Sequence, residues 1–137
     1  MRNYWLLKTE PSTYSFTDLE REKRAVWDGV ANALALKHLR SMQRGDLVFI
    51  YHTGEEKQII GTAEVTSDPY PDPRENDPKL AVIDLKPRER LPRPITLAEI
   101  KAKQEFQDFE LVRIGRLSVM PVSNYRWQRL CKIAAGS

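Results

Sequence analysis

Three short polar segments follow apolar stretches of the chain, and together they could recognise a flat heterocycle. Their side chains are Lys8, Thr9 and Glu10; Trp27, Asp28 and Asn32; and Tyr51, His52 and Thr53. A pocket for a planar ring needs an aromatic wall for stacking and a few polar groups that read its edge. If these segments meet at one mouth of the fold, they would form such a slot.

Trp27 has two interpretations, a core plug or the wall of a pocket. Stacking of a base on an aromatic side chain contributes about 1–3 kcal/mol. Turning that base out of its strand costs a few kcal/mol, so stacking alone roughly breaks even. Affinity would then depend on hydrogen bonds to the base edge and on phosphate contacts. The spacing of Trp27, Asp28 and Gly29 leaves both interpretations open.

Basic residues are clustered along the chain although the net charge is only +3. No acidic residue follows position 110. Clustered Arg and Lys attract nucleic-acid phosphates, but they are equally common on a solvated face or near a helix C-terminus. The candidates for phosphate contact are Arg88, Arg90, Arg126 and Arg129.

Signatures of catalysis, metal binding and cofactor binding are missing from the sequence. It has no glycine-rich phosphate loop, and His38 and His52 have no metal-ligand spacing. The single cysteine, Cys131, can form no internal disulfide. We therefore expect no metal, no cofactor and no enzymatic activity. A nucleophile pair such as His52 with Cys131 is an alternative that the sequence does not support geometrically.

The length and the hydropathy pattern predict one domain over residues 1–137. No apolar run approaches the roughly 20 residues that span a bilayer. The apolar patch at residues 5–7 is too short for a signal peptide. We therefore expect an intracellular, cytoplasmic protein that does not act at a membrane.

Alternation of apolar and polar residues predicts strands at residues 3–9, 47–53, 58–65, 81–90 and 117–122. Helices are predicted at residues 15–21, 31–42 and 97–103, with a terminal helix capped by Ser123. Four prolines in residues 68–78 favour a loop. Gly61 within a strand predicts a bulge or a close approach to the backbone. This order indicates an α+β domain whose strands curl into a small barrel.

Several motifs in one order resemble the EVE domain family of the PUA-like superfamily. They are YWLLKTEP (4–11), VWDGVAN (26–32), KHLR (37–40), GDLVFIYHT (45–53), IIGTAEV (59–65), PYPD (69–72), NDPK (76–79), LPRPITLAEIK (91–101) and GRLSVMPV (115–122). The resemblance covers nearly the whole chain. It implies a PUA-like pseudo-β-barrel of five or six mostly antiparallel strands flanked by helices.

The resemblance also implies a function, the non-catalytic recognition of a modified base in RNA or DNA. The order of elements is similar to that of YTH domains, which read methylated adenine in an aromatic cage. By that similarity Trp27 is one cage wall and Asn32 is a polar reader, while Lys8 and Thr9 form the floor. The other implied site residues are Tyr51, His52 and Thr53 at the rim, with Arg116 and Ser118 nearby.

The chain departs from the family pattern beside the implied cage. Ala31 and Ala33 flank Asn32 where the family usually has an arginine and a tyrosine, and Leu80 follows NDPK where a tryptophan is common. Leu80 as the second wall predicts a wider, weaker or differently selective pocket. The alternatives to a base reader are a binder of a free heterocyclic metabolite and an enzyme that acts on a nucleobase.

Overall fold

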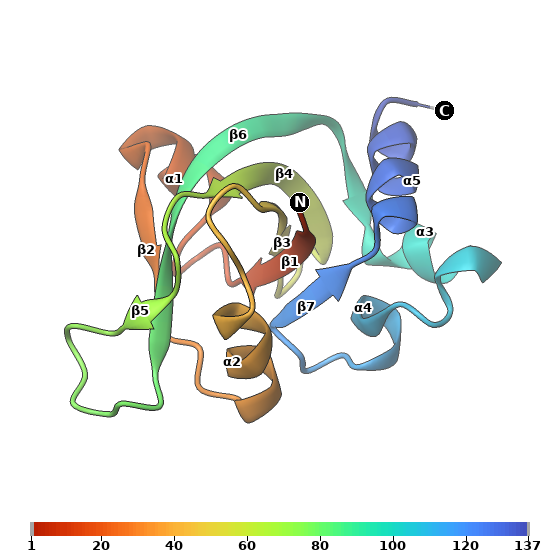
Figure 1. Ribbon diagram of the computed structural model, residues 1–137. Helices are drawn as coiled ribbons and strands as arrows, with labels where there is room; N and C mark the ends of the chain where they lie inside the picture. The colour runs from red at the N-terminus through yellow and green to blue at the C-terminus, as the bar shows by residue number, and fades with distance from the viewer. Residues whose placement is uncertain (1, 137) are drawn as a thin grey trace.

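The strands form a curled mixed sheet in the computed structural model, which describes residues 2–136 (Figure 1). They are β1 (Tyr4–Thr9), β2 (Ala25–Trp27), β3 (Leu47–His52), β4 (Gln58–Val65), β5 (Tyr70–Pro71), β6 (Ala81–Thr96) and β7 (Val119–Val122). The sheet order is β2-β6-β4-β3-β1-β7, and β5 pairs with β6 off this path. Of the pairs among the described residues, β1–β3 is parallel and the others are antiparallel. The predicted PUA-like, mostly antiparallel pseudo-barrel is confirmed as a half-barrel whose edges are β2 and β7.

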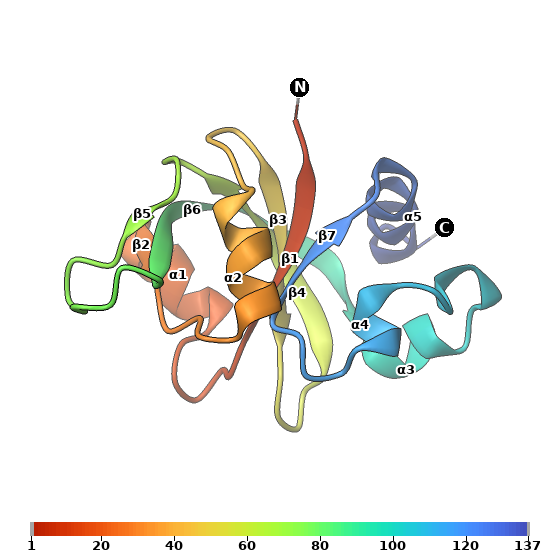
Figure 2. The same cartoon turned by 60° about the horizontal axis from the view of Figure 1, so that its bottom comes forward.

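The helices flank this sheet at its two ends, except one, which lies across its middle (Figure 2). They are α1 (Phe16–Glu22), α2 (Ala33–Arg40), α3 (Leu97–Lys101), α4 (Glu110–Arg113) and α5 (Asn124–Ala134), with a short 3-10 turn η1 (Gln104–Phe106). In Figures 1 and 2, α1 lies near β2 while α3, α4 and α5 gather at the opposite end, and α2 is the helix across the middle. Ser15, Thr96 and Ser123 accept backbone N–H groups as N-caps, which confirms the predicted cap at Ser123. No helix within residues 2–136 combines the length and apolar character needed to cross a bilayer.

A buried carboxylate sets the alignment of β1 with β3. Asp46 is only 1% exposed, and it accepts the Trp5 indole N–H at 2.9 Å and the Asn3 backbone N–H at 3.1 Å. Beyond this point the register places Lys8 opposite Tyr51. Because the pair is parallel, the ends of both strands reach the same edge of the sheet.

Gly61 confirms both expectations from the sequence. The β4–β6 register shifts beside it, and the ring of Phe16 from α1 lies directly over its backbone. His52 holds the start of the same helix, because its Nε2 accepts the Phe16 backbone N–H at 3.0 Å. The first helix is therefore fixed to the sheet by one close apolar contact and one buried hydrogen bond.

Several sequence-based boundaries are wrong. Strand β6 does not end at Arg90 but continues to Thr96, since the irregular pairing there leaves Pro92 and Pro94 outside the regular ladder. The prolines of residues 68–78 do not prevent β5, a two-residue edge strand. Trp27 belongs to strand β2 rather than to a turn. Helix α4 was not predicted because it has only four residues.

Gly61→Ala should lower the free energy of unfolding by about 1–3 kcal/mol, the usual cost of overpacking a core. The new Cβ would lie 2.5 Å from Cζ of the buried Phe16 ring. Urea unfolding followed by circular dichroism measures the change. Gly115→Ala is the matched control because a Cβ there meets no atom within 4 Å. Equal stability of the two variants would contradict the close packing of α1 on β4.

Candidate functional site

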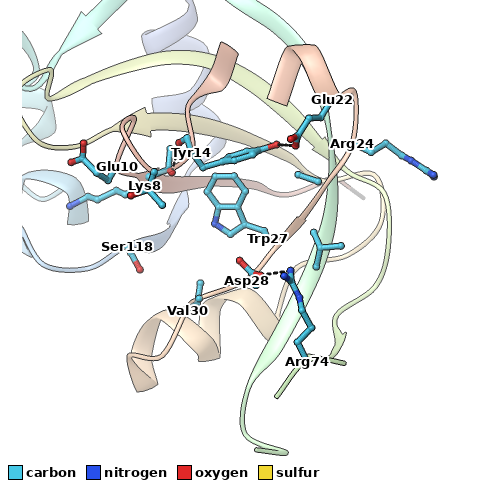
Figure 3. Close-up of a pocket in the computed structure, with 15 residues that line it drawn as sticks. Lys8, Glu10, Tyr14, Glu22, Arg24, Trp27, Asp28, Val30, Arg74 and Ser118 are labelled. Carbon is cyan, nitrogen blue, oxygen red and sulfur yellow. Dashed lines mark hydrogen bonds and ion pairs between the residues drawn. The ribbon is translucent and has the colours of Figure 1, made fainter. Parts of the chain in front are cut away.

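A pocket of about 690 Å³ opens where β1 ends beside β2. Its walls come from the end of β1, the loop before α1, strand β2 and the turn after it, with Arg74 and Ser118 from more distant segments (Figure 3). Of the residues predicted to form the site, the structure brings together Lys8, Thr9, Glu10, Trp27, Asp28 and Ser118 around this pocket.

Trp27 combines the two roles that the sequence left open. Its side chain belongs to the hydrophobic core and is only 8% exposed, yet it also borders the pocket. The ring of Tyr14 meets it edge to face, with 6.1 Å between centroids and 82° between planes. Figure 3 shows the two rings next to each other at the pocket. One aromatic pair therefore supports the fold and forms a wall of the pocket.

Tyr14 is one of the pocket residues that sequence reasoning missed. Its hydroxyl donates to Glu22 Oε1 at 2.6 Å, and burial together with this acceptor raises the pKa of the phenol. The Tyr14 ring therefore stays neutral and is held in a fixed orientation. No periodic signal identifies Tyr14, because it lies in the loop before α1. An aromatic residue in that loop was the only hint in the sequence.

Asp28 and Arg74 form an ion pair at the pocket. The carboxylate Oδ2 accepts from the Arg74 guanidinium at 2.7 Å, and both side chains are substantially exposed, at 42% and 71% (Figure 3). The backbone N–H groups of Asp28, Gly29 and Val30 donate no hydrogen bond within residues 2–136. The turn after β2 thus presents both hydrogen-bond acceptors and donors to a ligand.

The polar residues at the end of β1 mainly support the pocket. Thr9 Oγ1 donates to the Tyr14 carbonyl at 2.6 Å and so holds the loop before α1. The Lys8 amine extends away from Trp27 and donates to the Gly115 carbonyl at 2.8 Å (Figure 3). The Glu10 carboxylate accepts from Ser12 and Thr53. Ser118 donates no side-chain hydrogen bond within residues 2–136, so its hydroxyl can contact a ligand.

The remaining predicted base-binding residues lie outside this pocket. Asn32 is exposed, and its Oδ1 accepts the Ala35 N–H as the N-cap of α2. His52 is not a rim residue, since it is buried between the Phe16 N–H and Glu56. The other four are Tyr51 and Thr53, which border a smaller cavity, and Leu80 and Arg116, which border none of the described pockets. The second aromatic group near Trp27 is therefore Tyr14, and Leu80 is not a wall.

The arginines predicted to contact phosphate have neighbours within the chain. Arg90 pairs with Glu20 at 2.6 Å, and Arg129 makes two hydrogen bonds to Glu105 at 2.8 and 3.1 Å. Arg88 lies 3.5 Å from Glu89, and the Arg126 guanidinium lies over the Phe109 ring. A phosphate would have to compete with carboxylates at most of these positions.

The sequence and the curled sheet match a known class of domain. The family model of the EVE domain matches residues 3–133, and this chain belongs to that family. Thymocyte nuclear protein 1 of Mus musculus is 29% identical over 90% of this chain and 70% of its own length.

Solved structures agree over almost the whole chain. The structure of Rpa0253 from Rhodopseudomonas palustris has a TM-score of 0.92 at 38% identity, covering 97% of this chain and 93% of its own. Human THYN1 protein, solved in complex with DNA that contains 5-methylcytosine, has a TM-score of 0.88 at 26% identity. That match covers 96% of this chain and 97% of the human one.

Trp27→Ala should lower the free energy of unfolding by about 3–5 kcal/mol, as expected when a large buried aromatic side chain is removed. Arg74→Gln should change it by less than about 1 kcal/mol, because the ion pair with Asp28 is exposed. Thermal and urea unfolding of both variants measure the difference. A Trp27→Ala variant as stable as wild type would show that the ring is not part of the core.

Proposed function

We propose that this chain is a non-catalytic nucleic-acid-binding domain that holds one modified base, turned out of its strand, in the Trp27 pocket. The observation that carries the proposal is the aromatic pair Trp27 and Tyr14 beside the exposed carboxylate of Asp28. A pocket of about 690 Å³ is within the usual range for small-ligand sites. The human relative solved with 5-methylcytosine DNA supports a base as the ligand.

The chemistry of the pocket suits a base with an exocyclic amine and a methyl group. The Asp28 carboxylate can accept from such an amine, as Asp and Glu do from cytosine N4. Val26 and Val30 offer apolar surface to a methyl group. Trp27 is only 8% exposed, so it can contact the base with the small part of its ring that borders the pocket. Methylated cytosine in DNA meets these requirements, and RNA bearing such a base would meet them as well.

The Asp28–Arg74 ion pair uses Oδ2 of the carboxylate and leaves Oδ1 as an acceptor, so Asp28 can bind a base with the pair closed or open. Exposed ion pairs contribute about 0–1 kcal/mol, so opening this one costs little. Arg74 could then turn to a phosphate of the bound strand. We infer that the ion pair occupies Asp28 in the unliganded domain without blocking the pocket.

A free heterocyclic metabolite is the second candidate ligand. The observation in its favour is the charge of the pocket lining, where Glu10, Glu22 and Asp28 balance Lys8, Arg24 and Arg74. Salt dependence separates the two candidates, because oligonucleotide binding weakens steeply with salt and nucleoside binding responds little. An enzymatic role for His52 has no support from its position, since both ring nitrogens contact groups of the chain itself.

The wild-type protein should bind a single-stranded DNA oligonucleotide with one central 5-methylcytosine more tightly than the unmodified oligonucleotide. Asp28→Asn should weaken binding of the modified strand by about 1–3 kcal/mol, or roughly 5- to 150-fold, because the acceptor for the exocyclic amine is changed. Fluorescence anisotropy with labelled oligonucleotides at fixed salt measures both effects.

Asp108→Asn is the matched control, since Asp108 is exposed and lines none of the described pockets. It should bind as wild type does. Equal affinity of wild type for modified and unmodified strands would overturn the base-reader proposal. If Asp28→Asn binds the modified strand no more weakly than Asp108→Asn, the Asp28 carboxylate does not contact the base.

A further inference from the structure

A second, smaller cavity of about 190 Å³ lies at the same edge of the sheet as the Trp27 pocket. We call it the lysine pocket, and it is bordered by Lys8, Tyr51, Lys57 and Lys101, with apolar residues of α3 and α4. Figure 2 shows the turn between β3 and β4 beside α3, the region that carries Lys57 and Lys101. Lys8 borders both pockets.

The lysines of this pocket differ from the arginines discussed above in their surroundings. Among residues 2–136, none of Lys8, Lys57 and Lys101 forms an ion pair with a carboxylate. The Lys8 ammonium uses one donor on the Gly115 carbonyl and has two more available. Three lysines without a paired acid thus border a small cavity, an arrangement that favours an anion.

Tyr51 adds a neutral donor to this cationic cavity. The residue is only 3% exposed, yet its hydroxyl has no hydrogen-bond partner within residues 2–136. The described chain contains no buried polar side-chain atom that lacks a partner, so this hydroxyl is accessible to solvent, and Tyr51 borders the cavity. Burial raises the pKa of Tyr51, which keeps the O–H available as a donor.

The size of the cavity limits what it can take. Sites for small molecules usually measure about 300–1,000 Å³, and the lysine pocket is below that range. A base with its sugar would not fit, whereas a single tetrahedral anion would. Phosphate is the anion that ammonium groups and a hydroxyl donor bind together in nucleic-acid complexes.

We propose that the lysine pocket binds a backbone phosphate next to the base held at Trp27. This inference rests on the proposed function. The parallel pairing of β1 with β3 brings the two pockets together, since Lys8 lies opposite Tyr51 at the shared edge. The strand would then pass from the Trp27 pocket across Lys8 to the β3–β4 turn, away from the arginines on β6 and α5.

The test is a Lys57→Gln/Lys101→Gln variant titrated with a single-stranded oligonucleotide that carries one 5-methylcytosine. Affinity should fall about tenfold at low salt, and the slope of log K against log salt should decrease by roughly 0.7 for each phosphate that the variant no longer binds. Binding of 5-methylcytidine as a free nucleoside should stay unchanged. A Lys37→Gln/Lys132→Gln variant is the charge-matched control, because both lysines are exposed and line none of the described pockets.

The outcomes separate the two proposals. If the Lys57/Lys101 variant has the affinity and the salt slope of the wild type, the lysine pocket does not bind phosphate. The base-reader function would still stand. If the wild-type protein binds no oligonucleotide, the proposed function fails, and titration with inorganic phosphate decides the anion site. Shifts of the Gly54 and Gly115 amide resonances would then support phosphate binding in the lysine pocket, and unchanged resonances would contradict it.

Discussion

The buried carboxylate of Asp46 fixes how β1 lies against β3, and the positions of both pockets depend on that alignment. No tight turn can join parallel strands, so their register has to be set by other contacts. Asp46 supplies them by accepting the Trp5 indole and the Asn3 backbone N–H groups at the start of the pair. A slip of one residue would turn every side chain to the other face. Lys8 would then no longer lie beside Tyr51.

Some polar residues at this edge form hydrogen bonds that hold the fold, and others remain free to contact a ligand. Thr9 and Asn32 each bond a backbone group of the loop or helix that follows them, and His52 bonds the first turn of α1. These bonds stabilise the fold around the pocket, and the atoms that make them are not free for a ligand. Asp28 and Ser118 have capacity left. Recognition of a ligand therefore depends on few side chains. Trp27 serves both recognition and stability, because its ring borders the pocket and packs in the core.

The sequence predicted the elements better than it predicted the site. Alternating apolar residues define β3 and β4, and the caps Ser15, Thr96 and Ser123 mark their helices, because these signals are local. Prolines misled the prediction of β6, where an irregular register accommodates them. Tyr14 and Arg74 could not be predicted, since long-range packing alone brings their loops to Trp27 and Asp28. Residue types singled out Trp27 and Asp28, and the family resemblance implied Trp27 and Asn32, but neither could show that Asn32 is used as a helix cap.

The most direct test of the central claim is an NMR titration that follows the tryptophan indole resonances. The ligand is a single-stranded oligonucleotide with one 5-methylcytosine, compared with its unmodified form. Trp5 and Trp127 serve as internal references, since one is bonded to Asp46 and the other is stacked between Tyr4 and Phe49. The Trp27 indole resonance should shift more than those of Trp5 and Trp127. It should shift at lower concentrations of the modified strand than of the unmodified strand. Binding that leaves the Trp27 resonance unmoved would contradict the base-reader proposal.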